Sequence, residues 1–235
     1  MLHSLLISFF VLNAYAGVEN PRFSFLGGKY DNGYPKHKYT EVLDVVKGVY
    51  GPIIKSKGGS FYIQEDWFDG AVNMWAFRLG SEYWLEIPGG MSRYSLINEE
   101  AFITSICHEL GHLLGGEPKR GEISLEGQSD YYATQDCVQS LLLEIKPFKD
   151  LAISPGVLRL CGEDLLCGRV FEGALSLTSY YAELEGVSPP LISKKSQVQV
   201  KETLKTHPPA QCRLDTLYAG YYKEPRPSCW YKKSK

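Results

Sequence analysis

Two histidines four residues apart, with a glutamate directly after the first, are the residues of this sequence best suited to do chemistry. His108, Glu109 and His112 lie in the stretch SICHELGHLLGGE at 105–117. A helix turns about 100° per residue, so positions i and i+4 share one face. Two imidazoles on one face can bind the same zinc ion, and the glutamate is then held beside the metal without binding it. The spacing therefore predicts a metal site, although an ordinary amphipathic helix can carry the same pattern by chance.

The chemistry expected of such a site is hydrolysis of an amide bond. A bound zinc ion lowers the pKa of its water to about 7, and a neighbouring carboxylate can take the proton of that water. We therefore expect His108 and His112 to bind one Zn²⁺ and Glu109 to act as the general base. The substrate would be a protein or peptide, cleaved without a covalent intermediate.

A catalytic zinc ion needs a third protein ligand and keeps its fourth position for water. One common arrangement places a third histidine three residues after Gly115, but Pro118 stands there. The other common arrangement uses a carboxylate from the segment that follows. Glu117 and Glu122 belong to a charged loop, where acidic side chains are usually solvated.

A better pair of carboxylates lies in the stretch EGQSD. Glu126 and Asp130 are again four residues apart, so they share one face of the next predicted helix. We predict that Glu126 is the third ligand and that Asp130 accepts the free N–H of a ligand histidine, which fixes the orientation of the ring. Two solvated acids on a helix surface are the alternative interpretation.

The elements that must position these residues are helices next to a short sheet. Thr40 is a candidate cap for a helix through EVLDVVKGVY, and Gly51-Pro52 should break or kink it. Three aromatic and β-branched segments between 60 and 87 are predicted strands. Asn98 should cap the helix that carries the histidines, and Gly115-Gly116 should end it.

Two further helical segments are predicted after the histidine helix. One runs from about Ile123 to Ile145 and ends before Pro147, and the other covers VFEGALSLTSYYAELE. A helix, a short sheet and then a series of helices is an order typical of the α+β class.

The N-terminal stretch MLHSLLISFFVLNAYA has the form of a secretory signal peptide. An apolar run at 5–12 precedes Ala14-Tyr15-Ala16, a small-x-small cleavage site, so residues 1–16 should be removed. That run is too short to span a bilayer, and no later apolar stretch of about 20 residues predicts a transmembrane segment in the mature chain. We expect an exported protein, periplasmic or extracellular, with an extended lead-in at 17–37 and one domain at 38–235.

The six cysteines agree with export, and the nearly neutral charge balance argues against nucleic acid as the main partner. An even cysteine count in an exported protein suggests disulfides, of which Cys161–Cys167 is the expected local pair and Cys212–Cys229 a second. Buried free thiols are the alternative. The formal net charge is −2, with no run of five or more Lys and Arg, which argues against nucleic acid as the main partner.

Taken together with three further stretches, the histidine motif resembles that of a gluzincin zinc metallopeptidase. VNMWAF at 72–77 is similar to an asparagine-containing edge strand, and IPGGM at 87–91 to a turn before the active-site helix. THPPAQCRLDTL at 206–217 is similar to a C-terminal segment of the same family, which includes the CAAX prenyl proteases and the heat-shock protease HtpX. Because this sequence predicts none of the transmembrane helices of those proteins, the chain resembles a soluble, exported branch of the family.

The resemblance implies a fold and two more site residues. It implies a zincin-like α+β fold, with the active-site helices packed on a small, mostly antiparallel sheet. His207 would donate a hydrogen bond to the oxyanion of the tetrahedral intermediate, and Arg213 would pair with Glu126 or with Asp130. A secreted or periplasmic endopeptidase follows from this set. A peptidoglycan peptide hydrolase and a non-proteolytic, zinc-stabilised binding or chaperone-like module are the competing interpretations.

Overall fold

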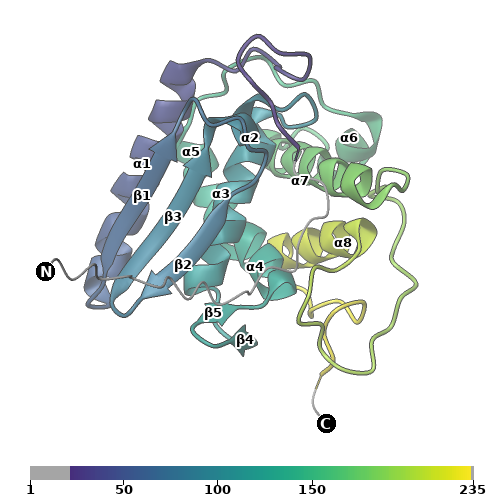
Figure 1. Ribbon diagram of the computed structural model, residues 1–235. Helices are drawn as coiled ribbons and strands as arrows, with labels where there is room; N and C mark the ends of the chain where they lie inside the picture. The colour runs from purple at the N-terminus through teal and green to yellow at the C-terminus, as the bar shows by residue number, and fades with distance from the viewer. Residues whose placement is uncertain (1–21, 234–235) are drawn as a thin grey trace, which may run out of the picture.

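The computed structural model describes residues 22–233, so the predicted signal peptide and residues 17–21 of the predicted lead-in lie outside the described residues. The described part of the lead-in forms turns and two isolated bridges, Phe23 with Ala71 and Asp31 with Tyr94. Figure 1 shows a small sheet on one side of the molecule with helices packed behind it. The fold is mixed α+β, as the order of elements predicted. Among the described helices, none is long and apolar enough to cross a membrane.

The main sheet has three strands in the order β1-β3-β2. They are β1 (Ser60–Asp66), β2 (Trp75–Leu79) and β3 (Glu82–Pro88). β2 and β3 form an antiparallel hairpin, but β1 pairs with β3 in parallel. The main sheet is therefore mixed rather than mostly antiparallel. After β1, the connection at 67–74 leads the chain to the far edge of the sheet, where β2 forms. β3 then lies between β1 and β2.

A buried arginine and two glycines hold this connection against the turn after β3. The turn continues into α2 (Gly89–Arg93), and Arg93 Nη1 donates to the carbonyl oxygen of Trp67 at 2.6 Å. A Cβ on Gly90 would lie 2.1 Å from the carbonyl oxygen of Gly70, so no larger residue fits there. The two glycines of the IPGGM stretch thus permit a close approach of two backbone segments.

Only one face of the sheet is covered by helices. Leu85 and Ile87 of β3 point into the core and are 0% and 1% exposed. On the opposite face, Trp84 stacks between the rings of Tyr62 and Phe77. This alternation places the helices on the inner face, where α1 (Lys36–Ser56) packs against β1 and α3 (Glu99–Leu114) against β2.

The first helix is longer than predicted at both ends. α1 spans Lys36–Ser56, so it begins after Pro35 rather than at Thr40, and it continues through Pro52. Pro52 lies on the exposed side of the helix, whereas Ile54, two residues later, is fully buried. Burial of Ile54 stabilises the last turn despite the hydrogen bond that proline cannot donate.

The histidine helix is confirmed with its predicted ends. α3 spans Glu99–Leu114, the side chain of Asn98 accepts from the N–H of Ala101 at 2.8 Å, and Gly115 follows the last turn. α3 packs between the sheet and two further helices, α4 (Glu126–Tyr132) and α7 (Leu165–Glu185), and most of its residues are buried.

The next predicted helix begins later and is interrupted by a π-helical turn. β4 (Lys119–Arg120) and β5 (Ile123–Ser124) form a small hairpin, and the helix starts at Glu126. It continues as α4 (Glu126–Tyr132), η1 (Ala133–Cys137) and α5 (Val138–Glu144). The chain then forms α6 (Pro155–Cys161), α7 (Leu165–Glu185) and α8 (Ala210–Tyr221).

All six cysteines form disulfides. Cys161–Cys167 and Cys212–Cys229 are the two expected pairs, and Cys107–Cys137 is a third that joins α3 to η1. None remains as a free thiol. The pairing fits a protein that folds in an oxidising compartment.

Candidate metal centre

The candidate site lies where α3 faces α4. His108 and His112 are buried on α3, 4% and 8% exposed. Gly111, directly before His112, lies against α4, and a Cβ there would come within 2.7 Å of the α4 backbone. Because glycine permits this approach, Glu126 and Asp130 of α4 reach the two histidines from the opposite side.

The hydrogen bonds of the two imidazoles fix their tautomers. His108 Nδ1 lies 2.8 Å from Asp130 Oδ1, and His112 Nδ1 lies 2.8 Å from the carbonyl oxygen of Ser124. A carbonyl oxygen and a carboxylate only accept hydrogen bonds, so both Nδ1 atoms donate. In the neutral rings, both Nε2 atoms therefore carry no hydrogen and present a lone pair.

These two Nε2 atoms and one carboxylate oxygen converge. The Nε2 atoms of His108 and His112 are 3.1 Å apart, and Glu126 Oε2 lies 3.2 Å from the first and 3.6 Å from the second. This oxygen is buried and has no hydrogen-bond partner of acceptable geometry. Electron-rich atoms at such distances repel one another unless positive charge lies between them.

The spacing of the three atoms fits a metal ion. Ligand atoms at about 2.0–2.1 Å from a tetrahedral zinc ion lie about 3.3–3.4 Å from one another. Glu109 lies close as well, because one of its carboxylate oxygens is within 4.8 Å of a ring nitrogen of each histidine. His108, Glu109 and His112 together could hold a metal ion, and Glu126 brings a second carboxylate to the same place.

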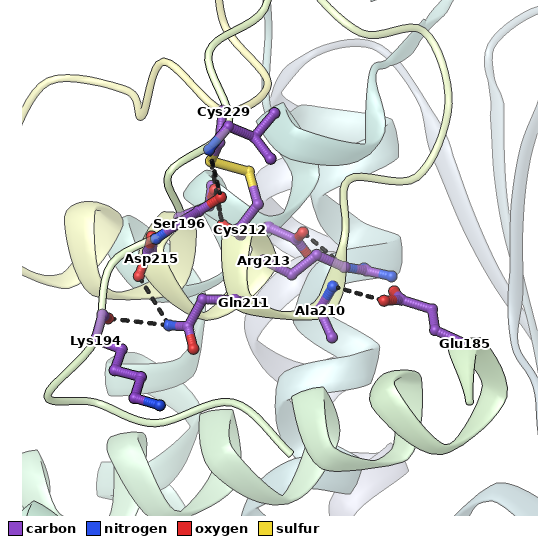
Figure 2. The surroundings of a disulfide bond; sticks show 12 residues. Glu185, Lys194, Ser196, Ala210, Gln211, Cys212, Arg213, Asp215 and Cys229 are labelled. Carbon is purple, nitrogen blue, oxygen red and sulfur yellow. Dashed lines mark hydrogen bonds and ion pairs between the residues drawn. A yellow bond between two sulfur atoms is a disulfide. The ribbon is translucent and has the colours of Figure 1, made fainter. Parts of the chain in front are cut away.

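Behind His108, the carboxylate of Asp130 is held by Arg213 of α8. Arg213 Nε donates to Asp130 Oδ2 and Nη2 to Oδ1, both at 2.8 Å, which is a bidentate pair. The guanidinium also lies 3.7 Å from the ring centroid of Tyr181 on α7. Arg213 is expected to pair with Glu126 or with Asp130, and in the structure it pairs with Asp130. Figure 2 shows the arginine on α8, next to Cys212.

His207 lies at the open edge of the site. Its Nε2 is 3.2 Å from Glu126 Oε2, and its side chain is 45% exposed. It belongs to the irregular segment at 187–209 between α7 and α8, and Pro208 favours an extended backbone at the histidine. Its imidazole is thus both close to the candidate ligands and open to solvent.

The charges around the cluster favour a cation between the histidines. Burial lowers the pKa of His108, but the attraction and the hydrogen bond of Asp130 outweigh this effect and raise the pKa to about 10. Burial raises the pKa of Glu126, yet its contacts with both histidines bring it well below its usual value. Positive charge is thus stabilised at Nε2 and negative charge on Glu126, and a metal ion can supply the positive charge as a proton does.

Glu109 has the opposite property. Burial raises the pKa of its carboxyl above the usual value, and the nearby histidines offset this only in part. A carboxylate with a raised pKa binds a proton more readily, which is what a general base needs.

None of the known family models, curated proteins or solved structures matches this chain.

Two residues of the candidate site could not be predicted from the sequence. Ser124 orients His112 through its main-chain carbonyl, which leaves no side-chain signal. Tyr181 supports Arg213 from α7, and no spacing in the sequence connects the two.

Proposed function

We propose that the protein is an exported, zinc-dependent endopeptidase with a zincin-like fold that resembles the gluzincins. The convergence of His108 Nε2, His112 Nε2 and Glu126 Oε2 at 3.1–3.6 Å carries this proposal. Glu126 is the better third ligand, because its Oε2 is buried without a hydrogen-bond partner, and Glu109 is left for proton transfer. The three disulfides support export.

Each remaining residue has a role that follows from its contacts. A zinc ion, when bound, acidifies a water molecule and polarises the carbonyl of the bond to be cleaved. Glu109 takes the proton of the water. Asp130, held by Arg213, keeps the ring of His108 oriented through its Nδ1–H. His207 is exposed enough to donate an N–H to the oxyanion of the substrate.

The position of β2 supports an extended peptide as substrate. β2 is an edge strand of the main sheet and packs beside α3, which carries the histidines. An extended peptide can add to such an edge by main-chain hydrogen bonds. A proline should be placed within Trp75–Phe77 at a residue whose main-chain N–H points to the free edge. It should abolish cleavage, because it removes one donor to the bound peptide, and leave the zinc content intact. Cleavage at the parental rate would refute this binding mode.

The Glu109→Gln variant tests the proposed chemistry. Glutamine keeps the shape of the side chain but cannot take a proton, so kcat should fall by about 10²–10⁴-fold. Zinc content should stay at the parental value, since His108, His112 and Glu126 are unchanged. The assay is cleavage of an unfolded protein, and peptidoglycan peptides are assayed separately as the alternative substrate class. A Gln variant that turns over as fast as the parent would remove the general-base role of Glu109. If the unaltered protein cleaves only peptidoglycan peptides, the proposed substrate class is wrong.

A further inference from the structure

The C-terminal segment at 224–231 packs directly behind Glu126. Trp230 is fully buried, and its indole lies against Gly127, the residue that follows Glu126 in the first turn of α4. A Cβ on Gly127 would come within 2.2–2.6 Å of three atoms of the indole ring. Glycine at this position therefore allows the ring to touch the backbone of α4 next to the carboxylate.

The same segment is joined to α8, which carries another residue of the site. A disulfide links Cys229 to Cys212, the residue before Arg213, as Figure 2 shows. Cys212, Cys229 and Trp230 form a small buried cluster of their own, separate from the main core. A covalent bond thus fixes Trp230 relative to the helix whose arginine holds Asp130.

Main-chain hydrogen bonds also connect Trp230 to the segment that carries His207. The carbonyl oxygen of Trp230 accepts from the N–H of Leu204 at 2.8 Å, three residues before His207. The indole Nε1, in contrast, is buried without a hydrogen-bond partner. An unpaired buried donor costs free energy, so contacts other than a hydrogen bond of the indole keep the ring in place.

Two polar contacts hold the rest of the segment on α4. Arg226 Nε donates to Gln128 Oε1 at 2.6 Å, and the hydroxyl of Tyr131 donates to the carbonyl oxygen of Glu224 at 2.7 Å. Both partners lie within five residues of Glu126 in the chain. The segment thus follows α4 along its first two turns.

We infer that Trp230 is a positioning residue for Glu126. Its indole supports the first turn of α4, so that Glu126 Oε2 stays within reach of both histidine Nε2 atoms. The inference rests on the proposed zinc site, and it assigns a role to the C-terminal segment that the site itself does not require. A purely structural Trp230, which only closes its small apolar cluster, is the alternative.

A double-mutant cycle between Gly127→Ala and Trp230→Ala separates the two roles. Each single change should weaken zinc binding by about 10–100-fold, the range found when the support of a metal ligand is removed. In the Trp230→Ala protein the added Cβ meets no indole, so Gly127→Ala should then cost far less. Trp230→Phe keeps an aromatic ring and should retain most of the affinity. The measurement is the dissociation constant for Zn²⁺, by competition with a chelator.

The control is Trp67→Ala, which removes a buried tryptophan that packs on Tyr39 and Arg93. It should lower the melting temperature and leave the zinc affinity unchanged. Trp230 and Gly127 variants that melt early but bind zinc as tightly as the parent would overturn the inference alone. If Trp230→Ala does not fold, Gly127→Ala and Trp230→Phe decide the question. A folded parent that binds no zinc would overturn the proposed function itself.

Discussion

Two buried arginine–carboxylate pairs contact α3, and only one of them belongs to the candidate site. At the N-terminal end of α3, Arg169 Nε donates to Glu100 Oε1 at 3.0 Å, and the two side chains are 5% and 3% exposed. At the other end, Arg213 pairs with Asp130, and these side chains are 3% and 1% exposed. By charge and burial alone, the two pairs are equivalent.

The neighbours of the two pairs distinguish them. Arg169 Nη1 donates to the carbonyl oxygens of Leu142 and Ile145 at 2.7 and 2.9 Å, so this arginine caps the C-terminal end of α5. The Asp130 carboxylate instead accepts from His108, whose Nε2 faces Glu126 and the second histidine. A buried ion pair by itself therefore does not indicate a site; the second pair is of interest because it orients a histidine of the proposed metal site.

Breaking the first pair should lower stability and leave zinc binding unchanged. Arg169→Met leaves Glu100 buried without its partner, and burial already raises the pKa of that carboxyl. The free energy of unfolding should fall by about 3–5 kcal/mol, because an uncompensated buried charge remains. Zinc affinity should stay at the parental value. Urea denaturation and chelator competition measure the two quantities.

The matched control replaces both partners of this pair. Glu100→Gln combined with Arg169→Met removes the buried charge and should recover part of the lost stability. A single Arg169→Met variant with parental stability, or one that loses zinc, would show that the two pairs do not differ as described.

For the second pair, the distinguishing effect is expected on the free energy of zinc binding, where the change is smaller. Asp130→Asn removes the charged acceptor of His108 Nδ1–H, and zinc affinity should fall by about 10–100-fold, or about 1.4–2.7 kcal/mol. Glu100→Gln is the same carboxylate-to-amide change in the first pair and should leave zinc affinity unchanged. Equal zinc affinities in the two variants would remove the distinction between the pairs.

Local rules explain what the sequence could predict. The cap at Asn98, the end of α3 at Gly115 and the shared faces of His108 with His112 and of Glu126 with Asp130 all depend on spacings of a few residues. The Cys161–Cys167 disulfide is local in the same sense. The roles given to these side chains remain predictions, although the structure brings the side chains together.

Contacts between distant segments explain what the sequence could not predict. The parallel pairing of β1 with β3 depends on how the connection at 67–74 packs under Arg93. Pro52 stays inside α1 because Ile54 is buried by tertiary packing. The packing of Trp230 on Gly127 joins residues that are far apart in the chain, and no local pattern indicates it.

The proposed function depends on the binding of one zinc ion by His108, His112 and Glu126. The most direct test is the zinc content per molecule of the purified protein, measured by elemental analysis beside a Glu126→Ala variant. We predict about one zinc ion per molecule in the parent and much weaker binding in the variant, because three protein ligands would become two. A folded, freshly prepared parent without zinc would refute this metal site, and the non-proteolytic binding module would then be the better interpretation.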